Sequence, residues 1–239
     1  MYQFVSADTP ELLNEVYRIR YQVYCVENQF EDPALNPGGI ERDEYDDHSV
    51  HGLLLDRTSK AAVGTVRVIM HKPGARPGSL PFHKVCQADL HRAELLPYRT
   101  TAEFSRFAIS KQLRRGAGGR VGASIAAPGA GGHIAIPHIT VGLITAALRL
   151  CFANGVTHAC AVMEPTLLRL LSRFGIHFEP LGPQVPYHGW RQPCFAKLAT
   201  LMAGIEQERR DVWDAVTERG RLWSPTPHAS PNIVEPIVA

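Results

Sequence analysis

The sequence predicts an α/β (α+β) domain built on one mixed, mostly antiparallel sheet with helices on its faces. Three observations lead to this fold class. Apolar runs of strand length alternate with longer segments of helical periodicity. Two neighbouring runs are joined by a turn of only five residues, and no internal repeat occurs within the 239 residues. One sheet flanked by helices accommodates the predicted order of strand, helix, three strands, helix, strand, helix and two strands.

The first 72 residues are predicted to form a strand, a helix and a hairpin. A short strand is expected at residues 3–7. A helix should follow from Pro10 to about Asn28, because a capping residue, a proline and a glutamate precede apolar residues spaced by three and four. The apolar runs at 48–56 and 62–72 are joined by the turn RTSKA, which is typical of an antiparallel hairpin.

The rest of the chain continues the alternation of helices and strands. The expected elements are a short helix within 82–93, strands at 101–110 and 157–163, helices at 137–153 and 165–174, two terminal strands at 177–181 and 194–198, and an amphipathic helix after 201. Glycine, alanine and arginine dominate 112–132, which predicts a mobile loop. We expect one domain at 1–223 and a proline-rich tail at 224–239.

The composition disfavours several classes of protein. Hydrophobic residues at 45% and charged residues at 20% are ordinary for a globular enzyme. A formal net charge of +2 does not indicate a nucleic-acid partner. The N-terminus lacks the pattern of a signal peptide, and no apolar stretch approaches the roughly 20 residues that cross a bilayer. We therefore expect no transmembrane segment.

Cysteine and histidine usage indicates neither disulfides nor a metal site. The five cysteines are odd in number, widely spaced and without a CxxC pair, which predicts buried, reduced thiols and a cytoplasmic protein. The histidines are scattered and lack zinc-ligand spacing, so no metal is expected.

Two groups of polar residues in the first 50 positions are candidates for chemistry. Arg20 and Tyr24 lie one helical turn apart, beside the apolar stripe of the first helix, and an exposed helix face is the alternative interpretation. Segment 41–47, ERDEYDD, contains five acids, for which a solvated loop is the alternative. The glycine and final glutamate of a calcium-binding loop are not at their positions there.

The third group lies within predicted strands. Arg67 interrupts an apolar strand, and Glu103 and Arg106 lie within TAEFSRFAIS. Charges in such positions are costly unless they are paired or face a solvated cleft, and a structural ion pair is the alternative to a functional site. Strand alternation places Glu103 and Arg106 on opposite faces. We therefore predict a β-bulge between them if both line one site.

These residues fall into ordered motifs that resemble a known family. The motifs are R-x-x-x-Y at 20–24, E-x-D-E-Y-D at 41–46, G-T-V-R at 64–67 and E-x-S-R-F at 103–107. This set, within about residues 17–110, is similar to the acyl-homoserine-lactone synthases, whose fold resembles that of the GNAT acetyltransferases. The resemblance implies a GNAT-like fold with a splayed central strand pair. Two positions depart from the family: Tyr24 replaces a phenylalanine, and Phe30 stands about where a tryptophan is expected.

The C-terminal half resembles a related group of enzymes. F-G-I-x-F-x-P-L-G-P at 174–183 and Y-H-G-x-R-Q-P at 187–193 look like the N-acyl amino acid synthases, especially the acyltransferases associated with PEP-CTERM/exosortase systems. The combined resemblance implies transfer of a long-chain fatty acyl group from a carrier thioester to an amine. Tyr187 and His188 are candidates to protonate the leaving thiolate, and a packed structural corner is the alternative.

The resemblance also implies roles for individual residues. The site residues carried over in this way are Arg20, Asp43, Asp46, Arg67, Glu103 and Arg106. We expect Glu103 and Arg106 to be catalytic and the other four to bind substrate, together with Tyr24 and Phe107 of the same motifs. Glu103 is the candidate base that accepts the amine proton. Arg67 and Arg106 offer forks for a carboxylate or phosphate, while Asp43 and Asp46 would either bind the acceptor's ammonium group or orient Arg20.

The expected donor is an acyl carrier protein with a phosphopantetheine thioester, or acyl-coenzyme A, and no tightly bound cofactor is expected. The basic residues predicted to dock the acidic carrier are Lys111, Arg114, Arg115 and Arg120. Three other functions stay open: a lactone synthase that uses S-adenosylmethionine, a non-catalytic module that binds acyl groups or carrier protein, and an acetyl-coenzyme A-dependent acetyltransferase.

Overall fold

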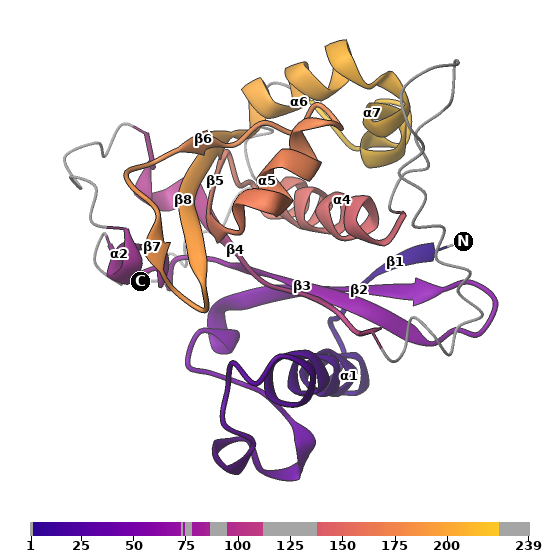
Figure 1. Ribbon diagram of the computed structural model, residues 1–239. Coiled ribbons are helices and arrows are strands. Elements are labelled where there is room, and N and C mark those ends of the chain that lie inside the picture. Colours follow the sequence, from indigo (N-terminus) through magenta and orange to yellow (C-terminus); the bar gives the residue numbers. More distant parts are fainter. Residues whose placement is uncertain (1, 73, 75–77, 87–94, 112–137, 225–239) are drawn as a thin grey trace, which may run out of the picture.

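The described part of the chain forms one sheet of eight strands with helices on both faces (Figure 1). The computed structural model describes residues 2–72, 74, 78–86, 95–111 and 138–224. The main elements are β1 (Tyr2–Ser6), α1 (Pro10–Tyr21), η1 (Gln22–Glu27), β2 (Ser49–Asp56), β3 (Ala62–Ile69), α2 (Phe82–Val85), β4 (Thr101–Ile109), α4 (His138–Ala153), β5 (His158–Met163), α5 (Pro165–Ser172), β6 (Glu179–Pro180), β7 (Val185–Pro186), β8 (Trp190–Lys197), α6 (Leu198–Glu208) and α7 (Arg210–Thr217).

The strand order is β1-β2-β3-β4-β5-β8-β6, with β7 paired to β8. All neighbours are antiparallel except β4 and β5, so the predicted mixed, mostly antiparallel sheet is confirmed. The parallel pair covers only Thr101–Phe104 of β4 against His158–Ala161 of β5. Beyond these residues the two strands continue without pairing to each other, and Figure 1 shows β5 and β8 running steeply across the direction of β2 and β3. The sheet is therefore splayed at its centre.

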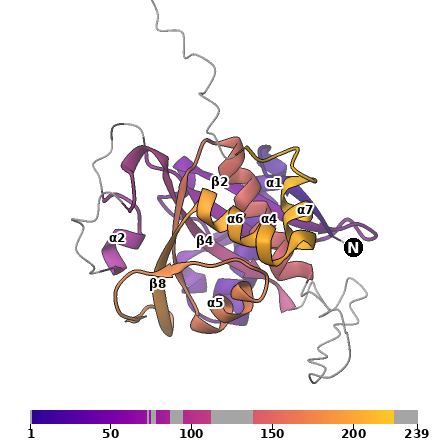
Figure 2. The same ribbon diagram turned by 90° about the horizontal axis from the view of Figure 1, so that it is seen from above.

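Helices α1 and α4 cover opposite faces of the first half of the sheet (Figure 1). Alternation along β2 explains this arrangement, because Leu53 packs with the α1 residues Val16 and Ile19, whereas Leu54 belongs to the cluster around α4. In Figure 2 the helices α4, α5, α6 and α7 lie in front of the sheet. Successive residues of one strand thus contribute to two separate cores.

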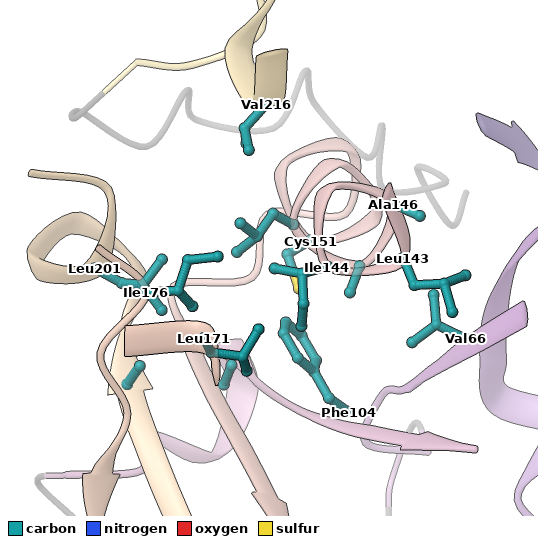
Figure 3. Packing of buried hydrophobic residues seen from close by; sticks show 14 of the residues in the cluster. Val66, Phe104, Leu143, Ile144, Ala146, Cys151, Leu171, Ile176, Leu201 and Val216 are labelled. Atoms are coloured by element: carbon teal, nitrogen blue, oxygen red, sulfur yellow. The ribbon is translucent and has the colours of Figure 1, made fainter. Parts of the chain in front are cut away.

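The larger core surrounds α4, which is apolar along most of its length. Figure 3 shows Ile144 and Cys151 of α4 beside Phe104 of β4. Leu171 of α5 and Val216 of α7 belong to the same cluster. Each of these side chains is at most 6% exposed. All five cysteines are buried and none forms a disulfide, which agrees with the prediction of buried thiols. None of the helices that the structure describes is long and apolar enough to cross a membrane.

Most predicted elements are present, with three corrections. The first helix reaches its predicted end, but its last part is the π-helix η1, in which the Asn28 amide donates to the carbonyl of Val23. The helix expected after 201 begins at Leu198 and breaks at Arg209, where the backbone leaves helical geometry (φ −142°, ψ 72°). The terminal strand pair is unequal, since β6 has only two residues. Predictions for 87–93, 112–132, 137 and the tail from 225 lie outside the described residues.

Candidate active site

A cavity of about 600 Å³ lies where β4 and β5 separate. One wall is formed by β3, β4, η1 and the loops on either side of residue 40. The other wall is formed by the ends of β5, α4 and α5 together with the β7–β8 hairpin. Residues that line the first wall include Tyr24, Phe30, Asp43, Arg67, Glu103 and Arg106. Residues that line the second wall include Ile144, Val162, Leu167, Tyr187, His188 and Arg191.

The first wall contains a network of charges that we call the charged cluster. It consists of three arginines and four acids: Arg20, Arg67, Arg106, Glu31, Glu41, Asp43 and Asp46. Arg20 is fully buried. Its Nε donates a hydrogen bond to Glu41, and its Nη1 donates one of 2.6 Å to Oδ1 of Asp46. The exposed-face interpretation of Arg20 is therefore wrong, and the end of α1 places its guanidinium beneath the acidic loop.

Two strand arginines complete the charged cluster. Arg67 on β3 donates through Nη1 to Asp43 (2.6 Å) and Asp46 (2.9 Å), and through Nε to the hydroxyl of Ser105 (2.9 Å). Arg106 on β4 donates through Nη2 to Glu41 (2.9 Å) and Asp43 (3.3 Å). Both guanidinium forks already hold carboxylates of this chain. The expectation that they stand open for a substrate anion is not supported by this geometry.

Some acids of segment 41–47 are buried and others face solvent. Glu41 and Asp46 are buried and Asp43 is partly buried, its side chain 20% exposed, whereas Glu44 and Asp47 are exposed, so the solvated-loop interpretation holds for only two of the five acids. Burial raises the pKa of Asp46, but the hydrogen bond and charge of Arg20, with the charge of Arg67, outweigh it and hold that pKa well below its ordinary value. With three positive groups and four negative groups, the charged cluster carries a net charge of −1.

A β-bulge brings Arg106 into the charged cluster. Pairing with β3 is regular from Glu103 to Ser105, and the register then shifts so that Thr65 lies opposite Ala108. Arg106 itself has a left-handed backbone, with φ at 47°. The predicted bulge is thus present, one step later than expected, at Arg106 rather than before it. Glu103 and Arg106 line the same cavity as a result.

Glu103 differs from every acid in the charged cluster. Its side chain is buried, the residue is 5% exposed, and none of the described cations forms an ion pair with it. One carboxylate oxygen accepts a hydrogen bond of 2.7 Å from the Phe82 amide at the start of α2. Burial is the largest influence and raises the pKa of Glu103 to about 7, although the Phe82 amide and the charge of Arg67 act in the opposite direction. Near neutral pH this carboxyl group can both accept and release a proton.

The remaining predicted site residues lie as follows. Tyr24 lines the cavity with its ring 4.9 Å from the guanidinium carbon of Arg106, and Phe107 lines the cavity as well. Lys111 is exposed; its amide donates to Glu27, and its Nζ lies 3.5 Å from Oδ1 of Asn28. The other three docking residues, Arg114, Arg115 and Arg120, lie outside the described residues.

Sequence reasoning missed several residues of the site. His51 is 2% exposed and lies directly opposite Arg67 in the β2–β3 register, a position that the predicted hairpin itself would have revealed. Burial lowers the pKa of His51 to about 4. Glu31 joins the site through the loop that follows η1, for which the sequence carries no periodic pattern. Arg191 joins it from β8, within the Y-H-G-x-R-Q-P motif, although it is not among the predicted site residues. Among the described residues, no three His, Cys, Asp or Glu side chains are grouped in a way that would hold a metal ion.

The aromatic residues of the two walls meet at one edge of the cavity. The ring of Phe30 lies 6.2 Å from that of Tyr24 and 5.1 Å from that of His188, which in turn lies 4.7 Å from Tyr187. His188 is partly buried by these contacts, but Tyr187 is 39% exposed, so the packed-corner interpretation fits His188 better than Tyr187. The contacts also fix the β7–β8 hairpin against the loop that follows η1.

Comparisons with known proteins bear on the fold and the class of protein. The sequence matches the acetyltransferase (GNAT) domain over residues 19–121, the segment that contains the charged cluster and Glu103. No curated protein matches the sequence.

Three solved structures share the fold. The CoA-dependent acyl-homoserine lactone synthase BjaI is 22% identical, with 95% of this chain and 91% of that chain covered and a TM-score of 0.56. TofI, solved in a ternary complex with an inhibitor and MTA, is 19% identical over 85% of this chain and 96% of that chain, with a TM-score of 0.54. FeeM, an N-acyl amino acid synthase from uncultured soil microbes, is 15% identical over 85% of this chain and 94% of that chain, also with a TM-score of 0.54.

At these identities the similarity shows the fold, which is a single GNAT-like domain with an open, mostly antiparallel sheet. The domain match and these structures together support an acyltransferase.

Proposed function

We propose that this chain is an N-acyltransferase that moves a long-chain fatty acyl group from the thioester of an acyl carrier protein to the amine of an amino acid or a similar small acceptor. The observation that carries the proposal is Glu103. It is a buried carboxyl group with a pKa near 7, free of ion pairs with described residues, in a cavity at the splay of the sheet. Such a group suits the removal of a proton from an attacking amine at neutral pH.

The proposed reaction is aminolysis of a thioester. The acceptor nitrogen, freed of its extra proton by the Glu103 carboxylate, attacks the thioester carbonyl carbon. Backbone N–H groups of β4 beyond Phe104, where β5 no longer pairs with it, would stabilise the oxyanion that forms. The carbon–nitrogen bond then replaces the carbon–sulfur bond. Glu103 releases the first proton to solvent, and after the attack the nitrogen gives up a second proton. That proton passes to the departing thiolate by way of Glu103 or His188, which also lines the cavity.

The two walls suit the two substrates, the amine acceptor and the acyl chain of the donor. Asp43, with a side chain 20% exposed and in a cluster of net charge −1, favours an ammonium or amine group at the first wall. Ile144, Val162 and Leu167 give the second wall an apolar surface that would accommodate an acyl chain. In this interpretation Asp46 orients Arg20 and Arg67, and Asp43 is the acid that faces the acceptor.

A lactone synthase that uses S-adenosylmethionine is the second candidate. It is favoured by the fold shared with the acyl-homoserine lactone synthase BjaI, whose structure with SAM and isopentyl-CoA also makes acyl-coenzyme A an alternative donor for this chain. The association with PEP-CTERM/exosortase systems and the cytoplasmic location rest on the sequence and stay predictions.

The test is turnover by the purified chain with octanoyl- and palmitoyl-charged carrier protein and the twenty standard amino acids, followed by mass spectrometry. We expect N-acyl amino acids with the wild type, and a kcat about 10²–10⁴-fold lower for Glu103→Gln. The wild-type kcat/KM should rise with pH up to about 7, as Glu103 loses its proton.

Other products would identify the alternatives. Methylthioadenosine and a lactone, formed when S-adenosylmethionine is added, would replace the proposal with the second candidate. Thioester binding without turnover under every condition would favour the non-catalytic module. Near wild-type turnover by Glu103→Gln with saturating donor would contradict the role of Glu103.

A further inference from the structure

We infer that Arg191 is the residue of the cavity that binds an oxyanion of a substrate, either the carboxylate of an amino acid acceptor or the phosphate of the donor's phosphopantetheine arm. This inference rests on the proposed function, because that reaction brings both anions toward the cavity. The two sources share one chemistry, a planar or tetrahedral group of anionic oxygens that a guanidinium fork holds through two hydrogen bonds.

The charges on the cavity walls distinguish Arg191 from the other arginines of the site. Among the described residues that line the cavity, three are arginines: Arg67, Arg106 and Arg191. The first two belong to the charged cluster, whose acids outnumber its arginines by one. A substrate anion placed beside them would meet Asp43 on the same wall, and like charges there are unfavourable. Of the three guanidinium groups, only that of Arg191 lies outside the charged cluster, in which Arg67 and Arg106 each contact at least two carboxylates.

The acidic partner of Arg191 is easily displaced. Nη1 of Arg191 lies 3.0 Å from Oε1 of Glu164, which precedes α5, and also donates to the carbonyl oxygen of Trp190 (3.3 Å). The Arg191 side chain is 15% exposed, but that of Glu164 is 52% exposed. A carboxylate that is half in water can leave the ion pair at little cost, because water solvates it again. A substrate oxyanion can therefore take the place of Glu164 without leaving a buried charge unpaired.

The β7–β8 turn packs against the guanidinium of Arg191. Gly189 has a left-handed backbone with φ at 92°, and a Cβ atom there would come within 3.3 Å of Nη1 of Arg191. The glycine thus leaves room for the guanidinium against the turn. The turn is closed by the Tyr187 amide, which donates to the Gly189 carbonyl (2.8 Å), and His188 packs on Phe30 of the opposite wall. Arg191 is held at the wall rather than free in solvent.

The experiment compares Arg191→Gln with the wild type in steady-state turnover, using matched substrates with and without each anion. The acceptor pair is the best amino acid of the twenty and its methyl ester. The donor pair is octanoyl-coenzyme A and octanoyl-N-acetylcysteamine, which lacks the phosphates. We expect the KM of one anionic substrate to rise about tenfold or more, with kcat nearly unchanged, and no change for its neutral counterpart. Arg191→Lys should recover part of the loss.

Each arm identifies one source. A change confined to the amino acid assigns the acceptor carboxylate, and a change confined to the coenzyme A thioester assigns the donor phosphate. Unaltered KM values for all four substrates in folded Arg191→Gln would overturn the inference. An equal loss for charged and neutral substrates would also overturn it, because that result indicates a general disturbance of the wall.

Two control variants separate binding from structure. Glu164→Gln removes the partner but keeps the guanidinium, so the affected KM should stay the same or fall. If this variant reproduced the loss of Arg191→Gln, Arg191 would act only through its ion pair. Arg210→Gln removes an arginine on α7 that is 62% exposed and does not line the cavity, and its kinetics should match the wild type.

A binding measurement keeps this test independent of the proposed reaction. Calorimetric titration of the wild type and Arg191→Gln with octanoyl-coenzyme A, and with the amino acid mixture, requires no turnover. If the wild type acylates no amino acid, the proposed function fails, while a weakened titration in Arg191→Gln still supports the oxyanion site. If turnover is seen but neither titration nor KM changes, the oxyanion site alone fails.

Discussion

The two walls of the cavity hold charge in opposite ways. In the charged cluster on the first wall, Arg20 is fully buried and Arg67 is 2% exposed, and each contacts at least two acids. On the second wall, Arg191 has one acidic partner, which is half exposed. Buried pairs hold their geometry because breaking them leaves an uncompensated charge, whereas an exposed pair exchanges readily with water and with ligands.

This contrast explains how one cavity can combine a fixed site with an adaptable one. The charged cluster links α1, the acidic loop, β3 and the bulge of β4, so four segments distant in sequence share one geometry. Arg191 instead lies on a hairpin whose contacts to the first wall are aromatic rather than ionic. The first wall is therefore expected to set stability and the orientation of the acceptor, and the second wall to respond to the substrate.

The largest expected effect is a loss of stability on breaking the charged cluster. Arg20→Met removes the only described cation that touches both Glu41 and Asp46, and it leaves these buried acids with fewer partners. We expect the free energy of unfolding to fall by about 3–5 kcal/mol, measured by urea denaturation at pH 7. A loss below about 1 kcal/mol would mean that the two walls hold charge in the same way.

The next effect concerns Glu103 and depends on pH. Its pKa in the folded protein, about 7, lies above the ordinary value of 4.5, so the folded state binds the proton more tightly than the unfolded state. The wild type should therefore lose stability relative to Glu103→Gln as the pH rises from 4 to 8, by about 3 kcal/mol in total.

The comparison with Glu103→Gln cancels the other titrating groups, because they are common to both proteins. Urea denaturation at several pH values measures the difference. If the two stability curves run parallel, Glu103 titrates near its ordinary value and is less desolvated than the structure indicates.

The fold could be predicted from the sequence because its elements depend on local patterns. The hairpin of β2 and β3, the cap and stripe of α1 and the apolar length of α4 are all properties of neighbouring residues. The resemblance placed Arg20, Arg67 and Arg106 in one cleft for the same reason, since their motifs are short and ordered. The bulge was also predictable, because strand alternation alone would have separated Glu103 from Arg106.

The unpredicted parts of the site depend on contacts between distant segments. Glu31 reaches Arg106 across 75 positions of the chain, and Phe30 reaches His188 across an even longer interval. Which acids of segment 41–47 are buried depends on the turn around Asp46 and on the arginines beneath it. The five acids look alike in the sequence, and only the packing determines which of them join the charged cluster and which face solvent.

A smaller effect on stability is expected for the second wall. Arg191→Gln removes an ion pair whose acid is half exposed, so the free energy of unfolding should fall by only about 0–1 kcal/mol. Thermal unfolding of this variant beside Arg20→Met measures the difference between the two walls directly. Destabilisation equal to that of Arg20→Met would show that Arg191 is a structural residue, contrary to its assignment as an oxyanion-binding group.

The smallest effect is expected within the acidic loop itself. Arg42 pairs with Asp47, but their side chains are 54% and 69% exposed, unlike those of Glu41 and Asp46 nearby. Arg42→Gln should therefore change the free energy of unfolding by only about 0–1 kcal/mol, and sodium chloride at 1 M should erase that change because salt screens exposed charges. Urea denaturation at low and high salt tests this. The deficit of Arg20→Met should persist in salt, since its partners are shielded from solvent; a salt-sensitive deficit there would place the charged cluster in contact with water and remove the distinction between the walls.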